Sequence, residues 1–249
     1  MTTHIELANV HKSFGPKHIL RGASIAIEKG ETLVILGGSG TGKSVLLKCL
    51  LGLESIQQGE ILISGKPTQN LKGDERMELM TQFGMLFQGA ALFDSMTVWE
   101  NIAFLLLRRG MDAKKAKAAA IEKLEMVGLK PEVADQAPSS LSGGQRKRVG
   151  LARAIAHGPQ IILYDEPTTG LDPVTSDVIN NLILQTQKNL GCTSIVITHD
   201  MTSAFKVANR MAFLLEGKFV EVGTPKEFRT TSNTTLRNFI EGRSEEYNR

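Results

Sequence analysis

A glycine-rich octet at residues 37–44, Gly-Gly-Ser-Gly-Thr-Gly-Lys-Ser, constrains the fold of this 249-residue chain more than any other feature. It fits the pattern G-x-x-x-x-G-K-[ST], follows the apolar run 32–36 and opens a helix-period stretch at 43–53. In such a loop, glycines let consecutive backbone N–H groups point inward, and the helix N-terminus adds partial positive charge. The octet therefore predicts a strand, a phosphate-binding loop and a helix, in that order. The alternative is an ordinary glycine-rich turn.

Each position of the octet has a predicted role in holding a nucleoside triphosphate and Mg²⁺. Lys43 is expected to neutralise the β- and γ-phosphates, and the hydroxyl of Ser44 to hold Mg²⁺. The remaining residues are expected to bind phosphate through their backbone: Gly37, Gly38, Ser39, Gly40, Thr41 and Gly42.

Short β-branched and aliphatic runs alternate with helix-period stretches along the chain. The expected strands are 23–27, 32–36, 60–63, 83–87, 161–164, 194–198 and 211–215, and the expected helices between them are 43–53, 177–190 and 202–209. This alternation predicts an α/β fold with a mainly parallel sheet. Residues 90–158 are almost wholly helical in pattern, with Asp112 as the N-cap of a helix that ends near Gly128. They predict an inserted helical lobe, and the polar C-terminal part predicts one short helix near 236–241.

Composition limits the classes of function. The 29 Lys and Arg against 26 Asp and Glu leave a net charge of +3, too weak to argue for a nucleic-acid partner. Cys49 and Cys192 lie in apolar surroundings with no metal-ligand spacing, which fits a reducing cytoplasm. The N-terminus lacks a secretory-signal pattern, and no apolar run approaches the ~20 residues that cross a bilayer. We therefore expect a protein that serves any membrane from its cytoplasmic surface.

Acidic side chains end the apolar run at 161–164. Adjacent side chains on a strand point to opposite faces, so Asp165 and Glu166 need different roles. Beside a phosphate-binding loop, Asp165 is placed to hold Mg²⁺ through water, and Glu166 to orient or deprotonate an attacking water. A polar strand end or a helix cap is the alternative.

His199 follows the run 194–198 and is a candidate for contacting the γ-phosphate, although a lone His after a strand is more often a satisfied polar residue.

A second anion site is predicted at residues 141–145, Leu-Ser-Gly-Gly-Gln, directly before the helical run 146–157. Ser142 and its glycines would then lie at a helix N-terminus. The basic run 146–148 in this helix is compatible with nucleic acid, but we favour a solvated helix face.

The order and spacing of these motifs resemble those of ABC-family ATPases over nearly the whole chain up to Gly223. The resemblance includes Walker A at 37–44, LSGGQ at 141–145, Walker B at 161–166, a D-loop at 170–172 and the H-loop His199. It implies one P-loop NTPase domain over 1–249, with an antiparallel β subdomain and an inserted helical subdomain. The implied core is 1–88 and 159–223, the helical subdomain 89–158 and a C-terminal extension 224–249.

The resemblance also implies a mechanism, with ATP and Mg²⁺ as cofactors. Two copies face head to tail, and the LSGGQ of one caps the γ-phosphate held by Walker A of the other. The capping residues would be Ser142, Gly143, Gly144 and Gln145. Gln88 would sense Mg²⁺ and join the core to the helical lobe, and Asp172 of the D-loop would contribute to the nucleotide site. Phe14 would stack on adenine, unless it is a core residue.

Residues 89–103 resemble a stretch found in ATPases of the MlaF type, which serve phospholipid-trafficking transporters. This branch implies a permease, an MCE-domain lipid-binding protein and a small STAS-domain protein as partners at the inner membrane. Just beyond Gln88, the side chains of Leu92, Phe93 and Met96 would form a groove for a permease helix, unless they belong to the lobe's core.

Three other functions remain as alternatives. A polar amino-acid importer shares parts of the same stretches. A soluble ABC ATPase of DNA repair would carry a long coiled coil, and one of translation two cassettes. A non-catalytic regulator would lack the lysine or the base, whereas Lys43, Asp165, Glu166 and His199 are all present.

Overall fold

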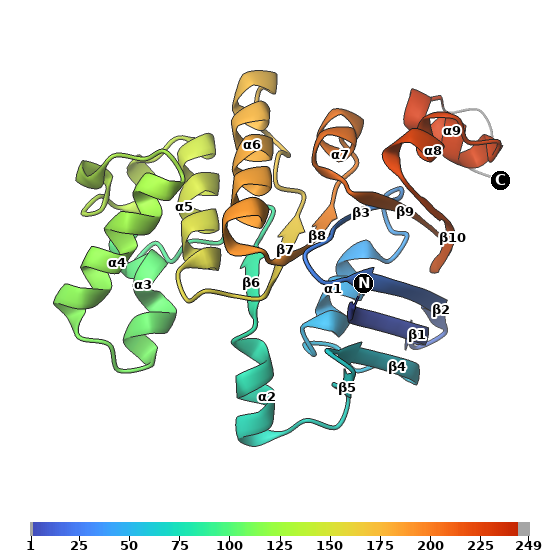
Figure 1. Ribbon diagram of the computed structural model, residues 1–249, viewed down its shortest axis with the longest axis horizontal. Helices are drawn as coiled ribbons and strands as arrows, with labels where there is room; N and C mark the ends of the chain where they lie inside the picture. The colour runs from blue at the N-terminus through green and yellow to red at the C-terminus, as the bar shows by residue number, and fades with distance from the viewer. Residues whose placement is uncertain (1, 244–249) are drawn as a thin grey trace. The chain divides into compact units, whose positions relative to one another are not determined.

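The computed structural model describes residues 2–243 and forms two compact units (Figure 1). The first unit contains the residues up to Met77 and those from Thr193 on, and the second runs from Glu78 to Cys192. Among the residues described, no helix combines the length and the apolar character needed to span a membrane.

An antiparallel sheet in the first unit has the strand order β2-β1-β4-β5. Its strands are β1 (Thr3–Phe14), β2 (Lys17–Glu28), β4 (Gln58–Ile63) and β5 (Lys66–Pro67). The sequence patterns did not predict β1. The reason is an irregular pairing with β2 between Leu7 and Val10, where Asn9 has a φ of +50° and breaks the two-residue alternation.

The other strands of the first unit form a mixed arrangement around a fully buried centre. β3 (Thr32–Leu36) pairs in parallel with β8 (Thr193–Ile197) on one side and with β9 (Arg210–Leu215) on the other, and β10 (Lys218–Gly223) runs antiparallel to β9. Every residue of β3 and β8 is buried, as expected of parallel strands covered on both faces. The strands predicted at 32–36, 194–198 and 211–215 are therefore confirmed within one residue.

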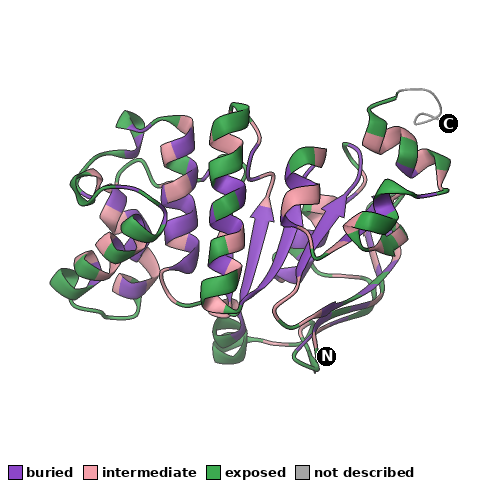
Figure 2. Ribbon diagram, turned by 45° about the horizontal axis from the view of Figure 1, so that its top comes forward, coloured by how far each residue is buried: buried purple, intermediate pink, exposed green. Residues whose placement is uncertain are grey.

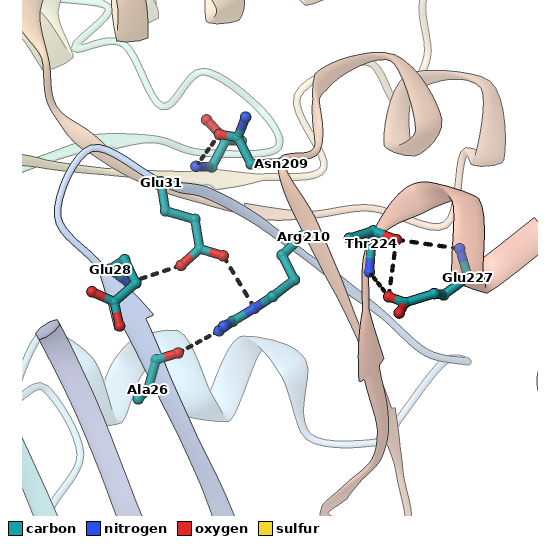
Figure 3. A network of polar contacts seen from close by, with 8 residues as sticks. Ala26, Glu28, Glu31, Asn209, Arg210, Thr224 and Glu227 are labelled. Atoms are coloured by element: carbon teal, nitrogen blue, oxygen red, sulfur yellow. Dashed lines mark hydrogen bonds and ion pairs between the residues drawn. The ribbon is translucent and has the colours of Figure 1, made fainter. Parts of the chain in front are cut away.

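Short helices complete the first unit. They are α1 (Lys43–Leu50), α7 (Met201–Val207), α8 (Pro225–Arg229) and α9 (Thr234–Glu241). The helix expected near 236–241 is present as α9, but α8 was missed. Its signal is a capping box, in which Thr224 and Glu227 satisfy each other's backbone N–H groups (Figure 3). The last residues of the predicted extension, 244–249, lie outside the described residues.

A polar network joins the two sheets of the first unit (Figure 3). The guanidinium of Arg210 on β9 pairs with Glu31 at 3.1 Å and also donates to the carbonyl of Ala26 on β2. The second carboxylate oxygen of Glu31 accepts the backbone N–H of Glu28 at 2.8 Å. Glu31, directly before β3, is thereby bound to β9 through Arg210 and to the end of β2 through Glu28.

Helices dominate the second unit. α3 (Val98–Arg108), α4 (Ala113–Met126), α5 (Gly143–Ile155) and α6 (Pro173–Leu190) accompany the parallel pair β6 (Phe83–Leu86) and β7 (Ile161–Asp165), while α2 (Gly73–Met80) crosses the boundary between the units. Figure 2 shows α6 with a buried and an exposed side, the division expected of a helix that covers a core.

The prediction of an almost wholly helical stretch at 90–158 is only partly correct. Asp112 is the N-cap of α4, as expected, because its side chain accepts the N–H groups of Lys114 and Lys115. Between α4 and α5, however, there are only two 3₁₀ turns, each starting at a proline, Pro131 and Pro138. Proline lacks the N–H that a helix interior needs. The domain boundaries inferred from the resemblance stay a prediction.

Gly84 tests how closely β6 approaches α5. A Cβ at this position would collide with the backbone carbonyl of Ala154, which has no side-chain freedom to move away. We expect Gly84→Ala to lower the free energy of unfolding by about 1–3 kcal/mol, measured by urea denaturation. Gly89→Ala, which faces open space, is the control and should change stability by less than about 0.5 kcal/mol. Equal stability of the two variants would contradict the close packing.

Candidate nucleotide-binding site

The glycine-rich octet forms the loop between β3 and α1, as the sequence predicted. The ammonium of Lys43, the first residue of α1, donates to the carbonyls of Gly37 and Gly38 at 2.7 Å each. The hydroxyl of Thr41 also donates to Gly38, at 3.0 Å. The loop therefore folds back over the side chain of Lys43, whose ammonium is hydrogen-bonded to the loop backbone.

The shape of this loop depends on residues without side chains. A Cβ at Gly37 would lie 2.5 Å from the carbonyl oxygen of Leu214 and 2.8 Å from the Thr41 hydroxyl, so the loop lies directly on β9. Gly40 and Gly42 have φ angles of +76° and +106°, which side chains disfavour. A cradle of glycines and one ammonium at a helix N-terminus fits the phosphates of a nucleotide. Ser44, predicted to hold Mg²⁺, is exposed beside it.

His199 leaves the same edge of the sheet as this loop. β3 and β8 are parallel, with Ile35 opposite Ile197, so both strands end side by side. His199 is exposed two residues after the end of β8, and Asp200 caps α7 by accepting the N–H of Thr202 at 3.0 Å. His199 thus lies at the same sheet edge as the P-loop, and its contact with a phosphate stays a prediction.

Phe14 is not a core residue. It ends β1 with 45% of its surface exposed, and the ammonium of Lys12 lies 4.7 Å from its ring centre. An exposed ring next to a fixed cation is free to stack on a flat ligand. The core alternative for Phe14 is therefore wrong.

In the second unit, parallel pairing brings Gln88 and the two acidic residues to one edge. Leu86 of β6 lies opposite Tyr164 of β7, so the residues that follow both strands emerge together. Gln88 is exposed, whereas Asp165 and Glu166 are half-buried. A carboxylate and an amide oxygen are donors that Mg²⁺ accepts, so Asp165 and Gln88 fit the predicted metal role.

The backbone of Glu166 is strained. Its φ is +48°, a conformation that costs a residue other than glycine about 1–3 kcal/mol. A turn holds it there: the N–H of Thr169 donates to the Glu166 carbonyl at 3.3 Å, and the Thr169 hydroxyl donates to the Glu166 carboxylate at 3.1 Å. Glu166 caps no helix, so the helix-cap alternative is wrong for this residue.

The predicted second anion site is built as a helix N-terminus. Ser142 is the N-cap of α5, with its hydroxyl accepting the N–H of Gln145 at 3.2 Å and its own N–H donating to the Gln145 side chain at 2.9 Å. Ser142 is exposed, and Gly143 and Gly144 follow it in the first turn. The side chain of Gln145 therefore stabilises the start of α5 by accepting the backbone N–H of Ser142.

The prediction of a solvated basic face on α5 is wrong for Lys147. Only 5% of Lys147 is exposed, and its ammonium donates to the carbonyl of Glu166 at 3.0 Å. Burial lowers the pKa of Lys147, while the carboxylates of Glu166 and Asp165 act in the opposite direction. The helical period contained the signal, because Lys147 is four residues from the buried Leu151.

Two further polar residues, Asp172 and Arg153, hold backbone groups of the second unit. Asp172 caps α6 by accepting the N–H groups of Val174 and Thr175 at 3.0 Å, and the hydrogen bonds from Thr175 lower its pKa. Its predicted contact with nucleotide stays a prediction. Arg153 of α5, which sequence reasoning missed, donates to the carbonyls of Ala90 and Ala91 at 2.7 and 2.6 Å.

Asn101, also missed, organises the loop after Gln88. It is fully buried on α3, and its side chain accepts the N–H of Phe93 at 2.7 Å. Its amide donates to the carbonyls of Phe93, Met96 and Thr97 at 3.0–3.2 Å.

The predicted site residues fall into two groups. The P-loop, His199 and Phe14 belong to the first unit, and the others belong to the second.

Comparison with known proteins decides the family. The family model for ABC transporters matches residues 20–169. The chain belongs to the ABC transporter family. It is an ATP-binding subunit and an ATPase, with ATP and Mg²⁺ as cofactors, and its α/β fold with mixed and antiparallel sheets is that of the family's ATP-binding cassette.

Several relatives match nearly the whole chain. The chloroplastic protein TRIGALACTOSYLDIACYLGLYCEROL 3 of Arabidopsis thaliana is 40% identical, over 96% of this chain and 73% of its own length. The methionine import ATP-binding protein MetN of Clostridioides difficile is 39% identical, over 95% of this chain and 73% of its own. A dimeric structure of the ATP-binding cassette MJ0796, bound to ADP and Pi, superposes with a TM-score of 0.81 at 32% identity, covering 89% of this chain and 98% of that one.

Replacing Lys43 tests the cradle. Lys43→Met removes the ammonium that the loop surrounds, so the affinity for ATP should fall at least about tenfold, since hydrogen bonds to charged groups contribute about 1.5–3 kcal/mol. Lys48→Met, on the exposed side of α1, should leave the affinity unchanged. Isothermal titration with ATP and Mg²⁺ measures both variants. Wild-type affinity in Lys43→Met would contradict a phosphate contact.

Proposed function

We propose that this chain is a transport motor in which ATP joins two copies head to tail. The observation that carries the proposal is the presence of two helix N-termini suited to an anion, the P-loop at the start of α1 and the exposed, capped Ser142 at the start of α5. In the proposed dimer, Ser142, Gly143 and Gly144 of one copy close over the nucleotide at Lys43 of the other. The dimeric structure of the related cassette MJ0796, bound to ADP and Pi, supports the formation of a dimer.

The roles that we propose for the remaining residues combine their residue types with the resemblance to ABC-family ATPases. Glu166 orients and deprotonates the water that attacks the γ-phosphate, and His199 contacts the same phosphate from the end of β8. Asp165, Gln88 and Ser44 would hold Mg²⁺, which would neutralise charge on the phosphates. Phe14 stacks on the adenine, and Asp172 sits close to the nucleotide across the dimer.

Glu166→Gln separates dimer formation from hydrolysis. The amide keeps the shape of the side chain but takes no proton, so hydrolysis should fall about 10²- to 10⁴-fold. Size-exclusion chromatography with ATP and Mg²⁺ should then show a stable dimer. Glu125→Gln, exposed on α4, should behave as wild type. If Glu166→Gln stays monomeric with ATP and Mg²⁺ while the wild type turns over, the head-to-tail model is wrong.

The loop after Gln88 is the proposed contact with a membrane permease. Phe93 is 43% exposed and packs on Phe104 at 4.8 Å between ring centres, and Arg153 lies 5.7 Å from the Phe93 ring. The buried side chain of Asn101 is hydrogen-bonded to the backbone N–H and carbonyl of Phe93 in this loop. An exposed aromatic residue on a rigid, hydrogen-bonded loop is suited to anchor a helix of a partner.

For the cargo we propose phospholipid, moved by a complex at the cytoplasmic face of the inner membrane. The MlaF-like stretch at 89–103 supports this cargo, as does the relative named after the lipid trigalactosyldiacylglycerol. An MCE-domain lipid-binding protein and a small STAS-domain protein are the further proposed partners. The main rival is an amino-acid importer, which the likeness to the methionine import protein favours.

Purification of the tagged chain from membranes tests partner and cargo together. The wild type should bring down a permease, an MCE-domain protein and phospholipid, identified by mass spectrometry. Phe93→Ser should reduce the recovered permease at least about tenfold, because it removes an aromatic side chain that the proposed interface would bury. Met126→Ser, an exposed apolar residue on α4, is the control. An amino-acid-binding protein in place of the MCE protein would exclude the lipid assignment.

A further inference from the structure

The buried ammonium of Lys147 has a specific target in the second unit. It donates to the backbone carbonyl of Glu166, at 3.0 Å, from the second turn of α5. The same carbonyl accepts the N–H of Thr169, whose hydroxyl binds the Glu166 carboxylate. Lys147 and Thr169 therefore both bind the backbone carbonyl of the residue proposed as the base, and Thr169 also binds its carboxylate.

The conformation of Glu166 makes this contact important. At a φ of +48° the side chain leaves the backbone in a direction that an extended residue at the end of β7 would not give it. Residues other than glycine keep such a φ only when their surroundings hold it. A cation fixed on the carbonyl opposes rotation of that peptide back to the extended form.

The charges around Lys147 agree with this task. An ammonium is costly to bury unless charged and polar groups compensate it, and a neutral carbonyl compensates it only in part. Burial lowers the pKa of Lys147, and the Glu166 and Asp165 carboxylates supply the opposite charge that counteracts this lowering. The side chain thus lies beside the two acidic residues that follow the apolar part of β7.

We propose that Lys147 is a positioning residue for ATP hydrolysis, which holds Glu166 in its strained conformation and ties the base to the helix that begins at Ser142. This inference rests on the proposed role of Glu166. It goes beyond that role because Lys147 would set the rate of hydrolysis without touching nucleotide.

The test compares four single variants and one double variant of the full chain, each purified with the membrane proteins that accompany it. Lys147→Met keeps the length of the side chain but removes the donor, and Lys147→Arg restores a donor. Arg148→Met is the matched control, because Arg148 is also on α5 and also donates to a backbone carbonyl, that of Gly128 at 3.0 Å. Glu166→Gln reports on the base itself.

We expect Lys147→Met to lower kcat at least about tenfold with an unchanged KM for ATP, since Lys43 and the P-loop are intact. Lys147→Arg should recover most of the loss, and Arg148→Met should keep wild-type kcat. In a Glu166→Gln background, single-turnover hydrolysis should show no further loss from Lys147→Met, as expected of residues that act as a unit.

Wild-type kcat in Lys147→Met, together with an inactive Glu166→Gln, would overturn the role of Lys147 and leave the proposed base intact. An equal loss in Arg148→Met, or loss of ATP binding in Lys147→Met, would also overturn it, because the lysine would then support the fold of α5 in general. Wild-type kcat in Glu166→Gln would instead contradict the proposed function.

Discussion

Parallel pairing of buried strands is the constraint on which the candidate site depends. β3, β8 and β9 are hydrogen-bonded in register, so the segments that follow β3 and β8 emerge at the same edge. The P-loop and His199 are neighbours for this reason alone, although about 160 residues separate them in sequence. The same logic in the second unit places Gln88 beside Asp165 and Glu166, since β6 and β7 are parallel. Burial of these strands makes the register rigid, because a shift by one residue would expose apolar side chains.

Cations that donate to backbone carbonyls hold the loops that leave these strands. Lys43 closes the P-loop on the carbonyls of Gly37 and Gly38, and Lys147 holds that of Glu166. Arg153 binds Ala90 and Ala91, whose φ angles of +61° and +48° are unusual for alanine. In each case the cation stabilises a backbone shape that the local sequence would not adopt by itself. Two of these cations lie on α5, the helix that begins at Ser142.

Patterns within short windows predicted much of this fold. The apolar runs of β3, β7, β8 and β9 and the N-cap Asp112 were recognisable because their signals are local. β1 was missed because an irregularity at Asn9 interrupts its alternation, and α8 because a helix of 5 residues has too few turns to show a period. Lys147, Arg153 and Asn101 were missed for another reason. Their partners are backbone carbonyls outside the helix that carries each residue, and the helical period indicates at most that Lys147 is buried, not what it binds.

The sequence by itself determined the P-loop of an ATPase, the capped helix start at Ser142 and the acidic residues at a strand end. These features depend on residue types at fixed spacing, which local backbone geometry converts directly into positions. Only the tertiary structure decided that Phe14 is exposed, that Lys147 is buried and that Glu166 is held in a strained turn. Exposure and strain depend on which elements pack together, and packing is set by contacts between residues far apart in the chain.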